Sequence, residues 1–346
     1  MNPGSRKKKK NVQIFNKFAL IRLAILSVLL FVLSIWAWLT MFRMPEKSYV
    51  EHLPPLKDKE ILLQHSLKQD IQKISVEIGL RNYSQPKNLD TARQFLENAL
   101  AKAGYKVEKQ KYQVKQNLYY NLAVEKLGTE NPNEIVLVGG HYDSAFNSPG
   151  ANDNGTGAAA TLELARLFAN QQTKRTIRFV EFVNEEPPFF TTKDMGSLVY
   201  ANQLSHEKKN IVAMLSLETM GYFSDTENSQ KYPFPINLFY PNKGDFIGFI
   251  GNLNSGDLVR QSISSFRRHA HFPSQGASLP SWMPGVGWSD QWSFWQHGYK
   301  GIMITDTAPF RYPFYHTEQD TIDKIDFDKL TRVVSGLADV ISDLAN

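Results

Sequence analysis

Three apolar segments of this chain end in residues that can bind a metal ion or move a proton. His141 follows the first segment after two glycines, and Glu218 comes directly after another. Adjacent Glu185 and Glu186 close a third, so one carboxylate can bind metal while its neighbour transfers a proton. Because ligands gather at the carboxyl ends of strands in α/β proteins, we expect these side chains to lie together.

Two loops add further groups of the same kind. Asp153 lies in the polar loop 150–155, before an alanine-rich segment, and His316 lies in the loop 315–321. Asp143, two residues after His141, is placed to orient that imidazole. Each residue alone has an ordinary explanation, such as a helix cap for Asp153 or a solvated corner for the glutamate pair.

Taken together, two histidines and four carboxylates at strand ends suit a hydrolytic zinc centre better than a structural one. The chain contains no cysteine, which excludes a disulfide framework and any thiolate metal site. A metal bound here must therefore have histidine and carboxylate ligands.

Alternating helical and strand patterns predict an α/β domain that positions these residues, with a mixed central β-sheet covered by helices on both faces. The predicted strands are 105–114, 119–127, 134–138, 176–183, 211–217, 236–240 and 301–305. The predicted helices are 63–78, 90–103, 155–170, 194–204 and 326–344. Trp288, Trp292 and Trp295 are spaced as on one helix and are expected to pack into the core, although a pocket wall is the alternative.

Residues 23–42 contain no charge, and at ~1.5 Å per residue such a helix spans the ~30 Å hydrocarbon layer of a bilayer. The preceding residues 1–22 are basic and contain no acid, which predicts a cytoplasmic N-terminus. The segment lacks a small-residue cleavage site, which favours an uncleaved signal anchor over a cleaved signal peptide. The remainder of the chain is then periplasmic or extracellular.

The chain has 39 Lys and Arg against 34 Asp and Glu, yet the basic excess comes from the N-terminal tail. Beside a membrane span, such a lysine run is better explained by topology and anionic lipid than by nucleic acid. We therefore expect membrane and peptide as partners and no nucleic acid. The predicted domains are a tail over 1–22, a transmembrane helix over 23–42, a spacer over 43–60 and a catalytic domain over 61–346.

From about Leu89 onward the chain resembles the co-catalytic zinc peptidase family of bacterial leucyl aminopeptidase, aminopeptidase Y and glutamate carboxypeptidase II. The resemblance rests on motifs that occur in the family's order. They are Gly140-His141-Tyr142-Asp143-Ser144, residues 150–157, Asn184-Glu185-Glu186, Leu217-Glu218-Thr219-Met220-Gly221, Ser289-Asp290 and Tyr315-His316-Thr317.

The resemblance implies two zinc ions and a role for each residue. His141 and Glu218 would hold one zinc, Glu186 and His316 the other, and Asp153 would bridge them. Glu185 would be the general base, and Asp290 would support the metal ligands without binding a metal ion itself. The implied activity is removal of residues from the N-terminus of peptides.

Several alternatives remain open within the resemblance. Many relatives have aspartate where this chain has Glu218, so a single-zinc enzyme is one alternative. Glutaminyl cyclases resemble the family and use one zinc, held by the equivalents of Asp153, Glu186 and His316. Carboxypeptidase activity and a non-catalytic, receptor-like binding domain are the other two.

Overall fold

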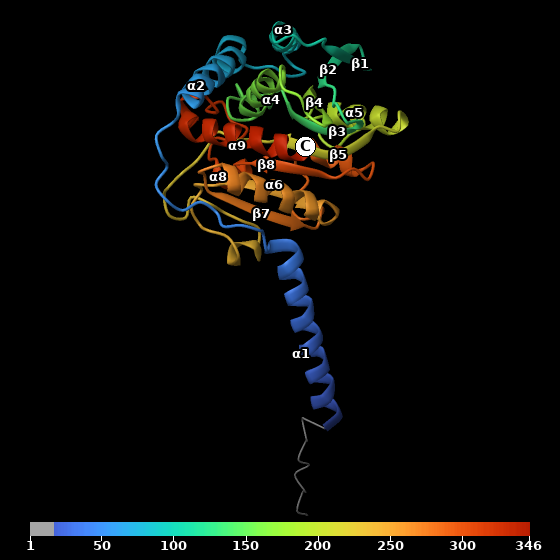
Figure 1. The fold of residues 1–346 in the computed structure, drawn as a ribbon, viewed down its shortest axis with the longest axis vertical. Helices are drawn as coiled ribbons and strands as arrows, with labels where there is room; N and C mark the ends of the chain where they lie inside the picture. The colour runs from blue at the N-terminus through green and yellow to red at the C-terminus, as the bar shows by residue number, and fades with distance from the viewer. Residues whose placement is uncertain (1–16) are drawn as a thin grey trace, which may run out of the picture. The chain divides into compact units, whose positions relative to one another are not determined.

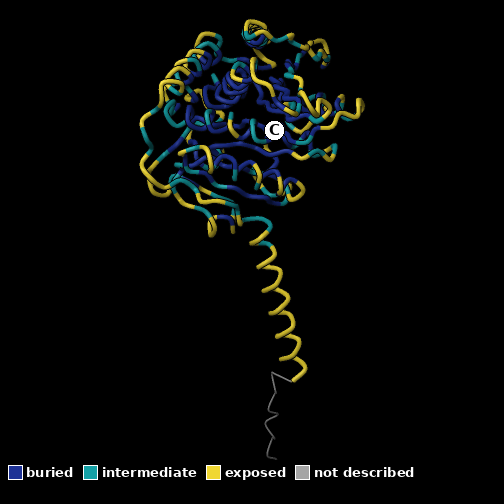
Figure 2. Tube along the Cα trace, viewed as in Figure 1, coloured by how far each residue is buried: buried dark blue, intermediate teal, exposed yellow. Residues whose placement is uncertain are grey.

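The computed structural model describes residues 17–346, so most of the predicted basic tail, residues 1–16, lies outside the described residues. Internal contacts divide the chain into two units, Met1–Arg43 and Met44–Asn346. In the first, helix α1 (Lys17–Ala37) continues into a π-helical turn, η1 (Trp38–Phe42), and α1 buries none of its residues (Figure 2). Residues Lys17–Phe42 are long and apolar enough to cross a membrane, a property that signal sequences share.

The second unit is built on one sheet of eight strands, in the order β1-β2-β4-β3-β5-β8-β6-β7 (Figure 1). The strands are β1 (Glu108–Val114), β2 (Asn117–Lys126), β3 (Asn131–His141), β4 (Arg175–Phe182), β5 (Asn210–Leu217), β6 (Ile247–Asn252), β7 (Ser274–Leu279) and β8 (Gly301–Thr305). The central strands β4, β3, β5 and β8 are parallel, whereas the β1–β2, β2–β4 and β6–β8 pairs are antiparallel. The predicted mixed sheet is confirmed.

Helices cover both faces of this sheet. The α-helices of the second unit are α2 (Asp58–Ile71), α3 (Pro86–Lys102), α4 (Gly155–Phe168), α5 (Gly196–His206), α6 (Gly256–His269), α7 (Gln291–Trp295), α8 (Ala308–Arg311) and α9 (Phe327–Ala345). Shorter π or 3-10 turns are η2 (Gln72–Ile78), η3 (Ile236–Leu238), η4 (Leu253–Ser255) and η5 (Ile322–Lys324). Val138 faces the larger core beneath α4 and α9, and its neighbour Leu137 faces a smaller core beneath α5 and α7.

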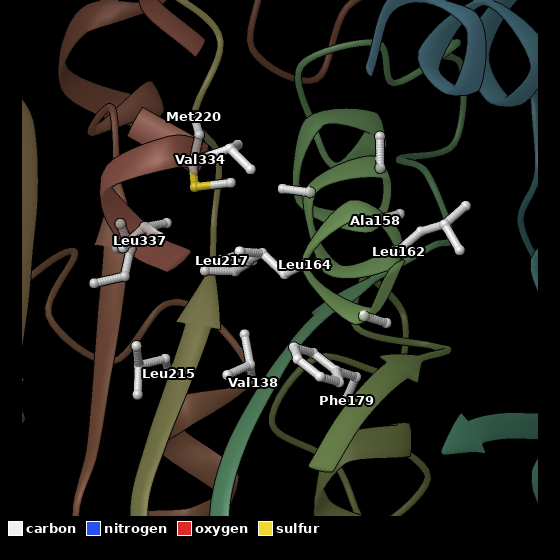
Figure 3. Close-up of a cluster of buried hydrophobic side chains, with 14 of the residues drawn as sticks. Val138, Ala158, Leu162, Leu164, Phe179, Leu215, Leu217, Met220, Val334 and Leu337 are labelled. Atoms are coloured by element: carbon white, nitrogen blue, oxygen red, sulfur yellow. The ribbon is translucent and has the colours of Figure 1, made fainter. Parts of the chain in front are cut away.

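The larger core holds α4 against the centre of the sheet (Figure 3). Val138 and Leu217 lie between Leu164 of α4 and Leu337 of α9, all fully buried. A Cβ atom on Gly157 would come within 2.3 Å of the Leu217 carbonyl oxygen, so glycine allows the first turn of α4 to approach β5 closely. This approach places the loop that carries Asp153 beside the ends of the central strands.

Most predicted elements are present with shifted ends, but the strand predicted over 236–240 is wrong. That segment contains the 3-10 turn η3, and Pro235 and Pro241 flank it, residues that favour turns over a continuing strand. The elements β6, α6 and β7 were not predicted. The two strands contain glycine and serine instead of a continuous apolar run, which weakens their pattern.

Candidate metal centre

The carboxyl ends of the parallel strands deliver most of the predicted site residues. His141 is the last residue of β3, Glu185 and Glu186 lie three and four residues beyond β4, and Glu218 directly follows β5. Asn184 adopts a positive φ of 60°, which turns the chain between β4 and the glutamate pair. Asp153 comes from the loop before α4, and His316 from the loop after α8.

The structure brings all six of these side chains together. His141 Nε2 lies 3.0 Å from Glu218 Oε2 and 3.5 Å from Asp153 Oδ1. His316 Nε2 lies 2.9 Å from Asp153 Oδ2 and 3.3 Å from Glu186 Oε2. Asp153 therefore faces a different histidine with each carboxylate oxygen.

Potential ligand atoms form three overlapping groups. In each group, all of these atoms lie within 4.8 Å of one another. The groups are His141, Asp153 and Glu218; Asp153, Glu186 and His316; and His141, Glu185 and Glu186. The first two share Asp153, and the third includes Glu185, whose Oε2 lies 3.7 Å from His141 Nε2.

These residues fit zinc by an observation independent of sequence. His141 Nε2, both oxygens of Asp153 and Glu186 Oε1 are buried and have no hydrogen-bond partner. Buried polar atoms without partners are costly, so several around one point indicate a missing ligand. Nitrogen and oxygen donors of this kind suit a hydrolytic zinc site.

The burial of so many carboxylates perturbs their protonation. Burial raises the pKa of Glu185 well above its usual value, that of Glu186 to about 7 and that of Glu218 to about 8. Burial also acts on Asp153, but the two neighbouring histidines lower its pKa below the usual range. Buried carboxylates repel one another, and a bound cation relieves that repulsion.

Asp143 fixes the orientation of three site residues. Its carboxylate accepts the backbone N–H groups of Glu185 at 3.2 Å and Glu186 at 3.1 Å. His141 Nδ1 lies 3.2 Å from the Asp143 carbonyl oxygen and 3.5 Å from its carboxylate. These contacts present His141 Nε2 to the other ligands.

Ser289 and Asn154 support Glu218 in a similar way. The Ser289 hydroxyl donates to Glu218 Oε2 at 3.0 Å, and Asn154 Nδ2 donates to the same atom at 3.1 Å. The neighbouring Asp290 is fully buried, and burial raises the pKa of its carboxyl to about 6. Neither Asp290 oxygen has a hydrogen-bond partner.

Two supporting residues were missed at the sequence level. Fully buried Arg81 donates to the carbonyl oxygens of Tyr142 at 2.7 Å, Pro149 at 2.5 Å and Gly150 at 2.8 Å, and so braces the loop that leads to Asp153. The carboxylate of Asp320 accepts the backbone N–H groups at positions 152 and 153. Asp320 lies only four residues after His316, which is the one signal that could have identified it.

A cavity lined mainly by apolar residues adjoins the centre. Glu218 and Tyr315 form its boundary with the site, and Ile250, Leu279 and Met303 belong to its wall. Trp288 also lines it, stacks on Phe310 and remains 45% exposed, so the prediction that Trp288 packs into the core is wrong. Its exposed ring borders the cavity because position 288 lies in the loop before α7 rather than on a helix.

An α/β domain with buried His141 and buried carboxylates beyond its parallel strands, joined by His316 from a loop, defines a metal-dependent hydrolase of the zinc exopeptidase class. The family model of peptidase family M28 matches residues 121–341, and the chain belongs to this family. It is a zinc metallopeptidase.

Individual proteins are also similar in sequence to this chain. YfbL of Escherichia coli K12 is 32% identical over 280 residues, which cover 78% of this chain and 85% of YfbL. An aminopeptidase of Pseudomonas aeruginosa UCBPP-PA14 is 35% identical over 149 residues, which cover 43% of this chain and only 25% of that protein.

Solved structures share the fold at low sequence identity. A zinc aminopeptidase from Bacillus subtilis superimposes with a TM-score of 0.66 at 15% identity, covering 85% of this chain and 97% of that one. A glutaminyl cyclase from Bacteroides thetaiotaomicron superimposes with a TM-score of 0.63 at 18% identity, covering 84% and 99%. The fold alone therefore does not separate hydrolysis from cyclisation.

Proposed function

We propose that this chain is a membrane-anchored aminopeptidase with two zinc ions. His141 and Glu218 would hold one ion, Glu186 and His316 the other, and Asp153 would bridge them. The observation that carries this proposal is the position of Asp153, whose two oxygens face two different histidines. The pairing of each histidine with its own glutamate supports a two-ion site.

Glu185 would act as the general base. When bound, zinc lowers the pKa of a water molecule and polarises the scissile carbonyl group. Glu185 would accept the proton of the attacking water and deliver it to the leaving amine. The raised pKa of Glu185 supports the first of these roles, because a more basic carboxylate accepts a proton more readily.

The adjoining cavity favours an aminopeptidase over a carboxypeptidase. A carboxypeptidase needs a cationic group for the terminal carboxylate of its substrate. Among the described residues that line the cavity there is no lysine or arginine, whereas Glu218 stands at its boundary. An apolar N-terminal side chain fits such a cavity, with its free amine near carboxylates.

A single-zinc glutaminyl cyclase is the second candidate, favoured by the likeness to the Bacteroides structure. The Glu218 side chain argues against it. Hydrogen bonds from Ser289 and Asn154 direct Glu218 toward His141, which completes a second ligand pair that a cyclase does not need.

We also propose the topology of the chain. Residues 23–42 would span the membrane once, with the basic tail 1–22 in the cytoplasm and the catalytic domain 61–346 in the periplasm or outside the cell, joined by the spacer 43–60. The apolar helix over Lys17–Phe42 and the basic residues before it support this arrangement.

The decisive experiment uses the full chain in detergent, with metal content measured beside two assays. We expect about two zinc ions per chain and chelator-sensitive hydrolysis of aminoacyl anilides. Cyclisation of glutaminyl peptides with one zinc would instead make the chain a cyclase. A chain without metal or turnover would contradict both. Substrates blocked at the N-terminus are the matched control, because an aminopeptidase leaves them intact.

A further inference from the structure

Two loops that help to line the apolar cavity also expose large apolar side chains to solvent. Phe234 is 83% exposed and Leu238 is 68% exposed on the first loop, and Trp282 is 80% exposed on the second. These three residues, called the apolar rim below, are sequence neighbours of residues that line the cavity, among them Pro233 and Met283. Exposed apolar side chains gathered beside a site mark a contact surface.

The first loop contacts β7, the strand that also packs against the first residue of the catalytic unit. The Tyr240 hydroxyl donates to the carbonyl oxygen of Gly276 in β7 at 2.6 Å. A Cβ atom on the same Gly276 would come within 3.0 Å of the Met44 side chain. Met44 is the first residue of this unit and lies two residues after the apolar helix ends at Phe42.

Chain geometry limits how far Leu238 lies from Tyr240. Leu238 is two residues from Tyr240, and an extended chain advances at most ~3.6 Å per residue. Leu238 is therefore at most ~7 Å along the chain from Tyr240, the residue that contacts β7 beside Met44. If residues up to 42 cross a bilayer, the chain leaves the lipid two residues before Met44.

The loops that carry the apolar rim contain few charges. Residues 280–288 contain none, and residues 229–244 contain Lys231 and Lys243, with Glu227 and Asp245 just beyond the ends of that range. Lys243 pairs with Glu227, whereas Lys231 is exposed. Aromatic side chains with nearby lysines are typical of segments that lie at a membrane interface.

We propose that the apolar rim rests on the bilayer that holds α1, so that the cavity opens at the lipid–water interface. The inference rests on the proposed membrane anchor. The occupant of the rim is lipid, rather than a second copy of the chain or another protein.

The experiment uses single-cysteine variants. Because the sequence contains no cysteine, the introduced thiol is the sole labelling site in each variant. Phe234→Cys, Leu238→Cys and Trp282→Cys in the full chain are labelled with a nitrobenzoxadiazole fluorophore. The chain is reconstituted into nanodiscs of phosphatidylethanolamine and phosphatidylglycerol. Leu62→Cys and Leu127→Cys are matched controls, because their native side chains are 71% and 65% exposed. Anilide hydrolysis by each variant verifies that it is folded.

At the rim we expect doxyl-labelled lipids to quench fluorescence severalfold more than at the controls, and aqueous iodide to quench it less. Rim labels that iodide quenches as strongly as the controls would overturn the proposal. Labels shielded from both quenchers would also overturn it, because they would indicate a protein partner or a second copy. Leu29→Cys reports the anchor separately: iodide quenching there would mean that α1 does not span the bilayer.

Discussion

The backbone N–H of Asp153 donates to the carboxylate of Asp320 at 3.0 Å, although the two residues lie 167 positions apart. The same carboxylate accepts the N–H of Asn152 and the hydroxyl of Tyr312, both at 2.8 Å. The loop after α8 thus supplies His316 and also holds the residue that would bridge the two ions. The geometry of the centre depends on this loop as much as on the strands.

Glu185→Gln should retain zinc and lose at least about a hundredfold in kcat, because an amide cannot accept the proton of the attacking water. Zinc content and steady-state hydrolysis check this outcome. Glu130→Gln, a change at an exposed glutamate paired with Lys174, is the matched control and should leave kcat unchanged. Wild-type turnover by the Glu185 variant would contradict the proposed mechanism.

Asp153→Ala should lose zinc as well as activity, because both proposed ion positions share this carboxylate. At zinc concentrations of ~100 Kd, metal binding stabilises the folded chain by about 2.7 kcal/mol. Chelator should therefore lower the Tm of the wild-type protein and leave that of the variant unchanged. A variant with full zinc content and a chelator-sensitive Tm would rule out the bridging role.

Arg81→Met should destabilise the domain by about 1 to 3 kcal/mol for each buried carbonyl group of the 142–150 loop that loses its donor. The free energy of unfolding in urea measures this effect. Zinc content should also fall as the Asp153 loop loosens. Lys73→Met, at an exposed position of η2, is the control and should change stability little. Equal stability of the two variants would show that Arg81 does not brace the loop.

Asp70 predicts a pH dependence of stability away from the metal centre. Burial raises its pKa from 3.8 to about 7, and its side chain shares the Arg166 guanidinium with Glu163. Between these pH values the folded state binds a proton that the unfolded state has lost. The contribution of Asp70 to the free energy of unfolding is therefore fully present below about pH 4 and decreases as the pH rises toward about 7.

Asp70→Asn should remove this decrease, which amounts to at most about 1.4 kcal/mol per pH unit. Urea unfolding of both proteins across that range tests it. Parallel pH profiles for the wild-type protein and the variant would contradict the assignment to Asp70.

Local sequence was sufficient to predict the parts of the centre that follow strands. His141, Glu185 and Glu218 each come shortly after a buried apolar run, so their common edge follows from parallel strands. Arg81 and Asp320 could not be predicted in the same way. Their partners lie more than 60 and 160 residues away, and nothing in the neighbouring sequence indicates those contacts.

The lack of a local sequence signal also explains why β6, α6 and β7 were not predicted. Helix α6 is amphipathic, with Ile263 and Phe266 buried, yet it lies between two strands of weak pattern. With a strand predicted over 236–240, the local pattern does not predict the order of elements after β5. The contacts among β8, β6 and β7 fix that order, and they are tertiary.

Strand β7 lies at the end of the sheet order, and such a strand offers unpaired backbone groups to any neighbouring chain. The segment that leads into the domain covers part of this edge. The Ser48 hydroxyl accepts the N–H of Ser274, and Arg267 donates to the carbonyl oxygens of Pro45 and Glu46. Residues 45–48 thus also reduce edge-to-edge aggregation. A shortened protein that begins after residue 48 would expose the β7 edge, where a second chain could pair.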